Sequence, residues 1–306
     1  MNVVFAGTPE FAATILRGLM DSQNQVGLVI SQPDARRGRG RKTASPPVAK
    51  TAIEAGLPLR QPARISEAAG EISTFDILVV AAYGQLLRPD TLYAATNGAY
   101  NVHASLLPAY RGAAPIERAI MAGETQTGVT IMRMDEGLDT GPTALQRHCQ
   151  ISPDTTGGEL TQILADLGAK AIVDGLNLLE EQSLTLTPQD SLKATYAARL
   201  SVEDTILRWE GKAKMEHDRV RALAPRMGAR VFHAAVDGPI KILRTRIPDE
   251  GDYDLGPGKI YAANKRILVG CGRGVLEILE LQKPGSRSLD AASYLLGNRL
   301  EGRFEL

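Results

Sequence analysis

The chain has little of what marks secreted or membrane proteins. Its 306 residues include two cysteines, Cys149 and Cys271, whose spacing gives neither a disulfide framework nor a zinc knuckle. We therefore expect a reducing compartment and no metal site. No apolar run approaches the roughly 20 residues of a membrane-spanning helix. The first residues, MNVVFAGTPEF, lack a basic segment followed by an apolar stretch and a cleavage site. These absences predict a cytoplasmic location and no membrane contact.

The chain also lacks a net charge, since it has 35 basic and 35 acidic residues. The balance hides an asymmetry. Residues 1–204 hold 17 basic and 22 acidic side chains, whereas residues 205–306 hold 18 and 13. An acidic first part and a basic second part favour two domains, the second facing an anionic partner. Chance clustering of charged side chains on solvated surfaces would give the same counts. The charge distribution alone therefore does not establish two domains or an anionic partner.

Strand-like and helix-like segments alternate in the first half of the chain. Nearly continuous apolar runs such as VGLVIS and DILVVAA are typical of strands buried on both faces of a parallel sheet. The expected strands lie at residues 2–6, 26–31, 76–82, 99–102, 129–134 and 144–151. With helical patterns between the first three, the region predicts an α/β fold with a doubly wound, Rossmann-like sheet.

The first helix is expected directly after the first strand. Phe11, Ile15 and Leu19 recur every four residues, as one face of a helix requires. Thr8 is the expected N-cap, and Pro9 suits the first helical position. The turn between strand and helix lacks the G-x-G-x-x-G fingerprint of dinucleotide-binding domains, which disfavours a nicotinamide or flavin enzyme. A ligand site is still expected at the carboxyl ends of the strands.

The second half of the chain has a different pattern of expected helices and strands. Thr156 and Glu159 have capping-box spacing, which predicts a helix that closes the first domain near Glu181. A polar stretch follows, and from Thr205 one helix and several short β-rich segments predict a small antiparallel barrel or sandwich. We expect a Rossmann-like catalytic domain over residues 1–189, a linker over 190–204 and a C-terminal OB-like β-barrel domain over 205–306.

Two segments near expected strand ends carry candidate catalytic groups. Asn101 and His103 are two residues apart on a strand, so their side chains share one face. The imidazole transfers protons near neutral pH, and the amide donates to a developing oxyanion. Asp139 lies in the Gly-rich stretch MDEGLDTG, and its carboxylate would orient His103. The alternative is structural: His103 bonds a buried backbone group, and Asp139 is a turn residue.

Four motifs raise the catalytic interpretation above the structural one. NVHASLLP, YRGAAPI, TGVTIM and DEGLDTG occur in the order and at the spacings of the folate-dependent formyltransferases, and the chain resembles that family. The resemblance implies a catalytic set of Asn101, His103 and Asp139. It also implies 10-formyltetrahydrofolate as formyl donor and no metal. The implied folate-binding residues are Ser105, Leu106, Leu107, Pro108, Ala82, Tyr83 and Gly84.

A basic segment points to the acceptor of the formyl group. Residues 32–50 resemble the insertion loop with which the tRNA-acting members of the family grip the acceptor stem of initiator tRNA. The implied tRNA-binding residues are Arg36, Arg37, Arg39, Arg41 and Lys42. Arg39 is the expected critical contact. Guanidinium groups suit phosphates, although a solvated basic loop is the usual interpretation of such a run.

The resemblance covers essentially the whole chain, and the basic C-terminal half is similar to the oligonucleotide-binding barrel of the tRNA-acting members. It implies formyl transfer to the α-amino group of methionyl-initiator-tRNA, for translation initiation, by a monomer. One departure is that the stretch around Pro225 lacks the family's expected tryptophan. Two rivals stay open. One is a formyltransferase for a small amine, such as a nucleotide-linked sugar or a purine-pathway amine. The other is a non-catalytic RNA-binding protein.

Overall fold

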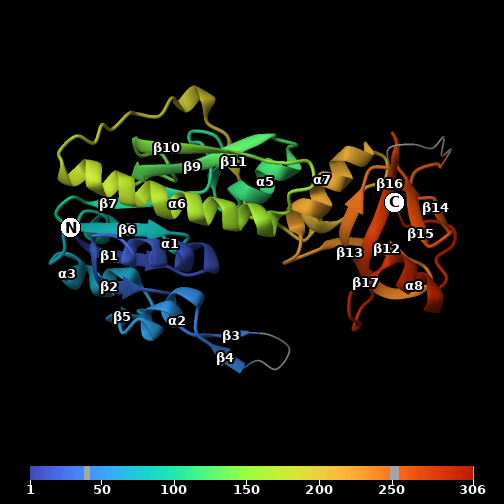
Figure 1. Cartoon of the computed structure of the whole chain (residues 1–306), viewed down its shortest axis with the longest axis horizontal. Coiled ribbons are helices and arrows are strands. Elements are labelled where there is room, and N and C mark those ends of the chain that lie inside the picture. The colour runs from blue at the N-terminus through green and yellow to red at the C-terminus, as the bar shows by residue number, and fades with distance from the viewer. Residues whose placement is uncertain (38–41, 249–254, 306) are drawn as a thin grey trace. The chain divides into compact units, whose positions relative to one another are not determined.

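The computed structural model describes residues 1–37, 42–248 and 255–305, which group by internal contacts into two units (Figure 1). The first unit comprises Met1–Pro115, Gln126–Cys149 and Thr161–Ala197. The second comprises Ile116–Thr125, Gln150–Leu160 and Ala198–Leu306. Two short segments that end before residue 161 thus group with the C-terminal part. The domain boundaries at residues 189 and 205 stay a prediction.

The first unit is built on a seven-stranded sheet with the order β10-β9-β7-β6-β1-β2-β5. The strands are β1 (Asn2–Gly7), β2 (Gln25–Ile30), β5 (Leu59–Arg60), β6 (Ile77–Ala81), β7 (Ala99–His103), β9 (Gln126–Arg133) and β10 (Thr143–Gln150). From β5 to β7 the neighbours run parallel, and β9 runs antiparallel to β7. The six expected strands are confirmed, and the two-residue β5 was not expected. The α/β fold class of the first half is therefore confirmed.

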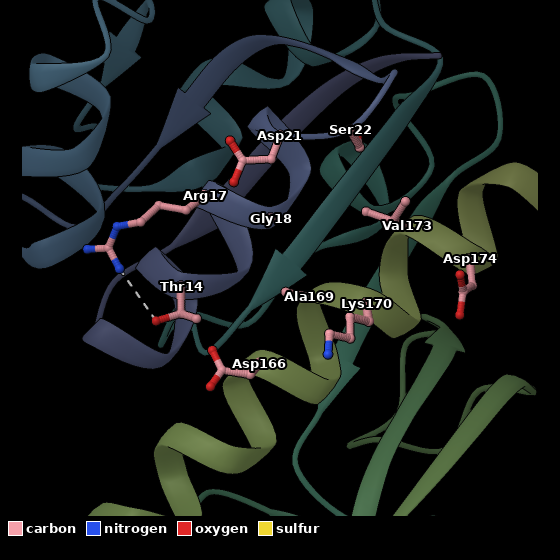
Figure 2. A pocket seen from close by; sticks show the side chains of 10 residues that line it. All are labelled: Thr14, Arg17, Gly18, Asp21, Ser22, Asp166, Ala169, Lys170, Val173 and Asp174. Atoms are coloured by element: carbon pink, nitrogen blue, oxygen red, sulfur yellow. Dashed lines mark hydrogen bonds between the residues drawn. The ribbon is translucent and has the colours of Figure 1, made fainter.

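Helices pack against this sheet and along its edge. They are α1 (Glu10–Met20), α2 (Pro47–Glu54), α3 (Ala69–Ile72), α4 (Pro89–Leu92) and α6 (Gly157–Glu180), with the 3₁₀ turns η1 (Ile65–Ala68) and η2 (Ser191–Lys193). Gly18 of α1 lies against Ala169 of α6, where a Cβ on the glycine would meet the Ala169 Cβ at 2.7 Å (Figure 2). A side chain at Gly18 would push the two helices apart.

The capping predictions had different outcomes. In α6 the capping box is confirmed: the Thr156 N–H donates to Glu159 Oε2 at 2.8 Å, and the Glu159 N–H donates to Thr156 Oγ1 at 3.2 Å. For α1 the predicted N-cap was wrong. The helix begins at Glu10 with Pro9 as N-cap, and the Thr8 hydroxyl donates instead to the Tyr83 carbonyl at 2.8 Å. A carbonyl from a distant segment competes for the hydroxyl, which local sequence does not reveal.

Two small strand pairs lie outside the seven-stranded sheet, and neither was expected. β3 (Ala35–Arg37) and β4 (Lys42–Ala44) pair antiparallel, and β8 (Arg111–Gly112) pairs parallel with β11 (Tyr196–Ala197). Gly112 has φ +119°, and a Cβ there would lie 2.8 Å from the Ala197 carbonyl oxygen. The β8–β11 pairing therefore depends on glycine at position 112.

The second unit contains a six-stranded antiparallel sheet of order β12-β13-β16-β15-β14, with β17 also paired to β16. Its strands are β12 (Ala229–His233), β13 (Val236–Arg246), β14 (Ile260–Ala263), β15 (Arg266–Gly270), β16 (Val275–Gln282) and β17 (Leu289–Asp290). Its helices are α7 (Ala213–Leu223) and α8 (Ala291–Gly297), with η3 (Glu203–Thr205). α5 (Pro115–Met121) lies almost wholly in this unit. The expected antiparallel β architecture is confirmed, whereas β17 and α8 were not expected.

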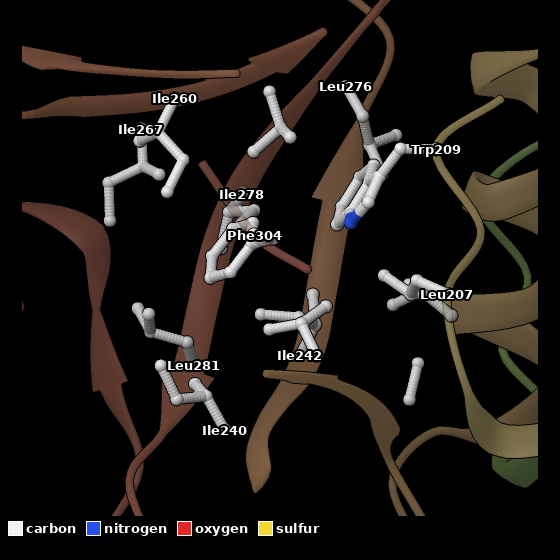
Figure 3. Close-up of a cluster of buried hydrophobic side chains, with 14 of the residues drawn as sticks. Leu207, Trp209, Ile240, Ile242, Ile260, Ile267, Leu276, Ile278, Leu281 and Phe304 are labelled. Carbon is white, nitrogen blue, oxygen red and sulfur yellow. The ribbon is translucent and has the colours of Figure 1, made fainter. Parts of the chain in front are cut away.

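The second unit has a hydrophobic core of its own. Trp209 and Phe304 are fully buried, and their rings stack with centroids 5.6 Å apart at an interplanar angle of 15°. Figure 3 shows these rings among isoleucine and leucine side chains from the sheet, such as Ile242 and Ile278. Within the residues that the structure describes, no helix is long and apolar enough to cross a bilayer.

Candidate active site

His103 ends strand β7, and its two ring nitrogens have different surroundings. The side chain is almost completely buried. Its Nε2 lies 3.0 Å from the carbonyl oxygen of Tyr110. Because a carbonyl only accepts, Nε2 carries the proton of this hydrogen bond. Nδ1 faces Asp139 Oδ2 at 3.6 Å, which is an electrostatic contact rather than a hydrogen bond. Nδ1 is therefore the nitrogen at which the ring can exchange a proton.

Asp139 reaches this position from the loop between β9 and β10. Its φ is +54°, which is the left-handed region that non-glycine residues rarely adopt. Its Oδ2 also accepts a hydrogen bond from the Gly112 N–H at 2.8 Å. The carboxylate is thus fixed by the YRGAAPI segment and turned toward His103. As the structural alternative predicts, His103 bonds a backbone carbonyl and Asp139 lies in a loop. The structure shows in addition the imidazole–carboxylate contact that a catalytic pair needs.

Asn101 lies two residues before His103 on the same strand, half-buried, between the neighbouring strands β6 and β9. Successive side chains alternate across a sheet, so Asn101 and His103 project from one face. The structure therefore brings an amide, an imidazole and a carboxylate to the end of β7. Among residues 1–37, 42–248 and 255–305, no three His, Cys, Asp or Glu side chains gather closely enough to hold a metal ion.

The SLLP stretch forms a braced loop directly after β7. Ser105 and Leu107 are buried, and Leu106 and Pro108 are half-buried. The Ser105 hydroxyl donates to the Ala109 carbonyl at 2.6 Å, and the Leu107 N–H donates to Thr130 Oγ1 at 3.1 Å. Ser105 and Leu107 therefore shape the loop, and Leu106 and Pro108 are the members that a ligand can reach.

The segment Ala82–Gly84 follows β6 and divides in the same way. Ala82 and Gly84 are exposed and have positive φ values of 44° and 90°. The Tyr83 ring lies in the hydrophobic core with 2% exposure, and this burial, helped by the charge of Glu67, raises the pKa of its phenol to about 12. A ligand at this loop would contact Ala82, Gly84 and the main chain, because the Tyr83 ring packs into the hydrophobic core.

The predicted tRNA-binding residues lie in β3, in β4 and in the segment between these strands. Arg36 and Arg37 belong to β3 and Lys42 to β4, with Arg37 opposite Lys42 in the ladder. Arg39 and Arg41 lie outside the described residues. At the base of this pair, Asp34 accepts hydrogen bonds from Ser45 Oγ at 2.9 Å and Gln61 Nε2 at 2.8 Å.

Sequence reasoning missed several residues that hold this site. Gln189, from the stretch expected to end the first domain, bonds both Arg111 and the main chain of the Asp139 loop. The Thr195 hydroxyl accepts a hydrogen bond from the Tyr110 N–H at 2.8 Å. A glutamine and a threonine in a polar stretch give no pattern, so no signal in the single sequence marks them.

A surface hollow of about 650 Å³ lies elsewhere, between α1 and α6 (Figure 2). Its walls carry Arg17 and Lys170 together with Asp21, Asp166 and Asp174. None of the predicted site residues lines it. Because both signs of charge are present, the hollow selects neither anions nor cations.

Comparison with known proteins places the chain in a family. The family model for formyl transferase matches residues 1–176, and the model for the formyl transferase C-terminal domain matches residues 199–299. The chain is 65% identical over 99% of both chains to a methionyl-tRNA formyltransferase of Rubrobacter xylanophilus. It is 43% identical to one of Nitrosospira multiformis, over 100% of this chain and 99% of that protein.

A solved structure agrees with these sequence matches at the level of fold. An N-formyltransferase from Helicobacter canadensis, in complex with folinic acid and dTDP-3-aminofucose, has a TM-score of 0.67 over 94% of this chain and 99% of its own. Its identity to this chain is 16%. The identities of the full-length relatives favour the tRNA enzymes over the sugar enzymes. The chain belongs to the formyl transferase family, in its methionyl-tRNA formyltransferase branch.

Proposed function

We propose that the chain transfers the formyl group of 10-formyltetrahydrofolate to the α-amino group of the methionine esterified to initiator tRNA, for translation initiation. The observation that carries the proposal is the buried contact of His103 Nδ1 with Asp139 Oδ2 at 3.6 Å, beside Asn101 at the end of β7. The 65% identity to a methionyl-tRNA formyltransferase over nearly the whole chain supports the choice of acceptor.

In the proposed reaction the free amine attacks the formyl carbon and forms a tetrahedral intermediate with a developing oxyanion. The Asn101 amide stabilises this oxyanion, as does His103 once its Nδ1 carries a proton, and each such donor contributes roughly 3–4 kcal/mol. Asp139 orients His103, and the pair takes a proton from the attacking nitrogen. The C–N bond to folate then breaks, a proton passes to the departing folate nitrogen, and the products are formylmethionyl-tRNA and tetrahydrofolate.

The proposed folate site lies along two loops that follow neighbouring strands. Ser105–Pro108 follows β7 and Ala82–Gly84 follows β6, and these strands are parallel. Their carboxyl ends therefore lie at one edge of the sheet, where α/β folds bind ligands. The accessible members Leu106, Pro108, Ala82 and Gly84 are the proposed contacts with the pterin and its linker, and no metal takes part.

The proposed tRNA contacts are the basic residues Arg36, Arg37, Arg39, Arg41 and Lys42, with Arg39 as the main one. The excess of basic over acidic residues in 205–306 supports a second, phosphate-facing surface. We further propose that the enzyme acts as a monomer in the cytoplasm, where charged tRNA is present.

The test is single-turnover transfer of labelled formyl from 10-formyltetrahydrofolate, with charged initiator tRNA and free methionine compared as acceptors. Fast labelling of the charged tRNA alone is expected. Transfer to neither acceptor with folate bound would redirect the search to another amine. Binding of tRNA without any transfer would favour a non-catalytic RNA-binding protein.

A further inference from the structure

The segment Gln189–Ala197, here called the strap, crosses the two loops that hold the catalytic pair. It belongs to the first unit and follows α6. Its last two residues form β11, which pairs with Arg111 and Gly112 of β8. Thr195 adds main-chain bonds: its N–H donates to the Pro108 carbonyl at 3.3 Å, and its carbonyl accepts from the Arg111 N–H at 2.8 Å. The strap is thus bound along residues 108–112.

Gln189, at the start of the strap, connects this loop with the loop of Asp139. Its Oε1 accepts hydrogen bonds from Arg111 Nε at 3.1 Å and Nη2 at 2.8 Å. Its Nε2 donates to the carbonyl oxygens of Asp139 at 2.8 Å and Gly141 at 2.7 Å. Arginine only donates and carbonyls only accept, so these partners fix the amide orientation. Both donors and both acceptor positions of the amide are used.

These bonds act on Asp139, which has an unfavourable backbone conformation. Asp139 has a φ of +54°, which a non-glycine residue keeps only when its surroundings hold it. Gln189 holds the Asp139 carbonyl, and the Gly112 N–H holds its carboxylate at 2.8 Å. Arg111, next to Gly112 and only 3% exposed, closes a ring of hydrogen bonds through Gln189.

We propose that Gln189 is a positioning residue for formyl transfer, which keeps the Asp139 carboxylate facing Nδ1 of His103 while the amine is deprotonated. The inference rests on the proposed function and adds a residue to its site. Gln189 acts through Asp139 and touches no reacting atom.

Gln189→Glu is the decisive variant. The new carboxylate still accepts from Arg111, with a favourable charge, so the buried guanidinium keeps a partner. The same carboxylate has no N–H to offer and opposes the carbonyl oxygens of Asp139 and Gly141. If Gln189 only stabilises the fold, the variant loses activity only to the extent that it loses stability. A positioning role predicts a stable variant that reacts slowly.

We expect Gln189→Glu to remain folded at the assay temperature, to keep both KM values, and to lose about 10- to 100-fold in single-turnover rate, the order that a misplacement of about 1 Å costs. Gln189→Ala, which removes all four bonds, should be at least as slow. Gln162→Ala is the matched control, because this exposed glutamine of α6 bonds only Asp166 on its own helix, at 3.0 Å.

A double variant separates positioning from an independent effect. Asn tolerates the left-handed region and keeps an oxygen for the Gly112 N–H, so Asp139→Asn is a conservative partner. If Gln189 acts through Asp139, then Gln189→Glu combined with Asp139→Asn is about as slow as Asp139→Asn alone. Losses that multiply would overturn the inference. So would a full-rate Gln189→Glu enzyme beside an active wild type, a result that leaves the proposed function intact.

Discussion

His103 carries the largest share of the proposed chemistry, and its surroundings show why a substitute would fail. The Tyr110 carbonyl holds the proton on Nε2, which leaves Nδ1 directed at Asp139. Tyr110 itself has a φ of +60° and is tied down by the hydroxyl of Thr195. Two left-handed residues, Tyr110 and Asp139, thus define the position of one imidazole.

Replacing His103 with Ala is expected to lower the rate of formyl transfer by about 10²–10³, because a positioned oxyanion donor and proton carrier are both lost. Binding of charged tRNA should change little, since a deeply buried ring offers almost no surface to a macromolecule. Single-turnover rates and a tRNA filter-binding assay measure the two effects. His148→Ala, at an exposed position of β10, is the control. A near-normal rate for His103→Ala would remove His103 from the mechanism.

At this scale, sequence and structure contribute different parts of the site. The order of four motifs predicted Asn101, His103 and Asp139, and the structure places His103 and Asp139 in contact. Gln189 was unpredictable, because its role comes from a chain segment about 50 positions away from Asp139 that returns to it only in the folded state. Folate binding at Tyr83 stays a prediction, and the burial of its ring in the core could not be foreseen, since a single sequence does not say which side of a loop is covered.

Among the elements, those with strong local periodicity were the predictable ones. The buried strands β1, β2, β6 and β7 and the apolar stripe of α1 follow from runs and spacings. The pairs β3–β4 and β8–β11 have two or three residues per strand, too few for any period to show. Tertiary partners decide whether these pairs form. A tertiary partner, the carbonyl of Tyr83, also binds the hydroxyl of Thr8, which caps no helix.

The basic side chains of segment 36–42 are expected to bind tRNA. Replacing Arg39 with Ala should weaken use of charged tRNA and reduce the slope of log affinity against log salt, because one fewer counterion is released. Titrations at several salt concentrations measure this slope. Arg17→Ala on α1 is the control, as its exposed pair with Glu10 contributes little. An unchanged slope for Arg39→Ala would identify the segment as a solvated surface.

The capping box of α6 predicts a pH-dependent helix start. Hydrogen bonds from the Thr156 N–H and hydroxyl hold the pKa of Glu159 below its ordinary value of 4.5. The ionised form is therefore favoured in the folded state, and this stabilisation is present above pH 4.5 and lost as the pH falls through the folded pKa. Thr156→Ala should cost about 1 kcal/mol at neutral pH.

The cost of Thr156→Ala should shrink at a pH below the folded pKa of Glu159, where the carboxyl is protonated in both proteins. Urea unfolding of the two proteins at pH 7 and at such an acid pH measures the difference. An equal cost at both pH values would show that the carboxylate contributes nothing to the cap.

At the scale of the whole molecule, the two units carry different parts of the proposed function. The catalytic candidates Asn101, His103 and Asp139 all belong to the first unit, whereas the basic excess lies in the C-terminal part. Segments 116–125 and 150–160 group with the second unit although they precede most of it in sequence. Arg221, on α7, donates to the Thr155 carbonyl at 2.9 Å, which is one of the bonds that hold segment 150–160 there.

The separate cores predict separate unfolding. Trp209 is the only tryptophan of the chain and lies in the second core against Phe304, so its fluorescence reports on the second unit alone. Far-UV circular dichroism reports on both units and is weighted toward the first, which holds most of the 24-residue helix α6. Phe304→Ala removes a fully buried ring and should destabilise the second unit by about 3–5 kcal/mol. We expect the fluorescence transition in urea to move to lower concentration, while most of the circular dichroism change keeps its midpoint. If both signals shifted together, the two units would unfold as one cooperative structure, and the division into separate cores would have no thermodynamic meaning.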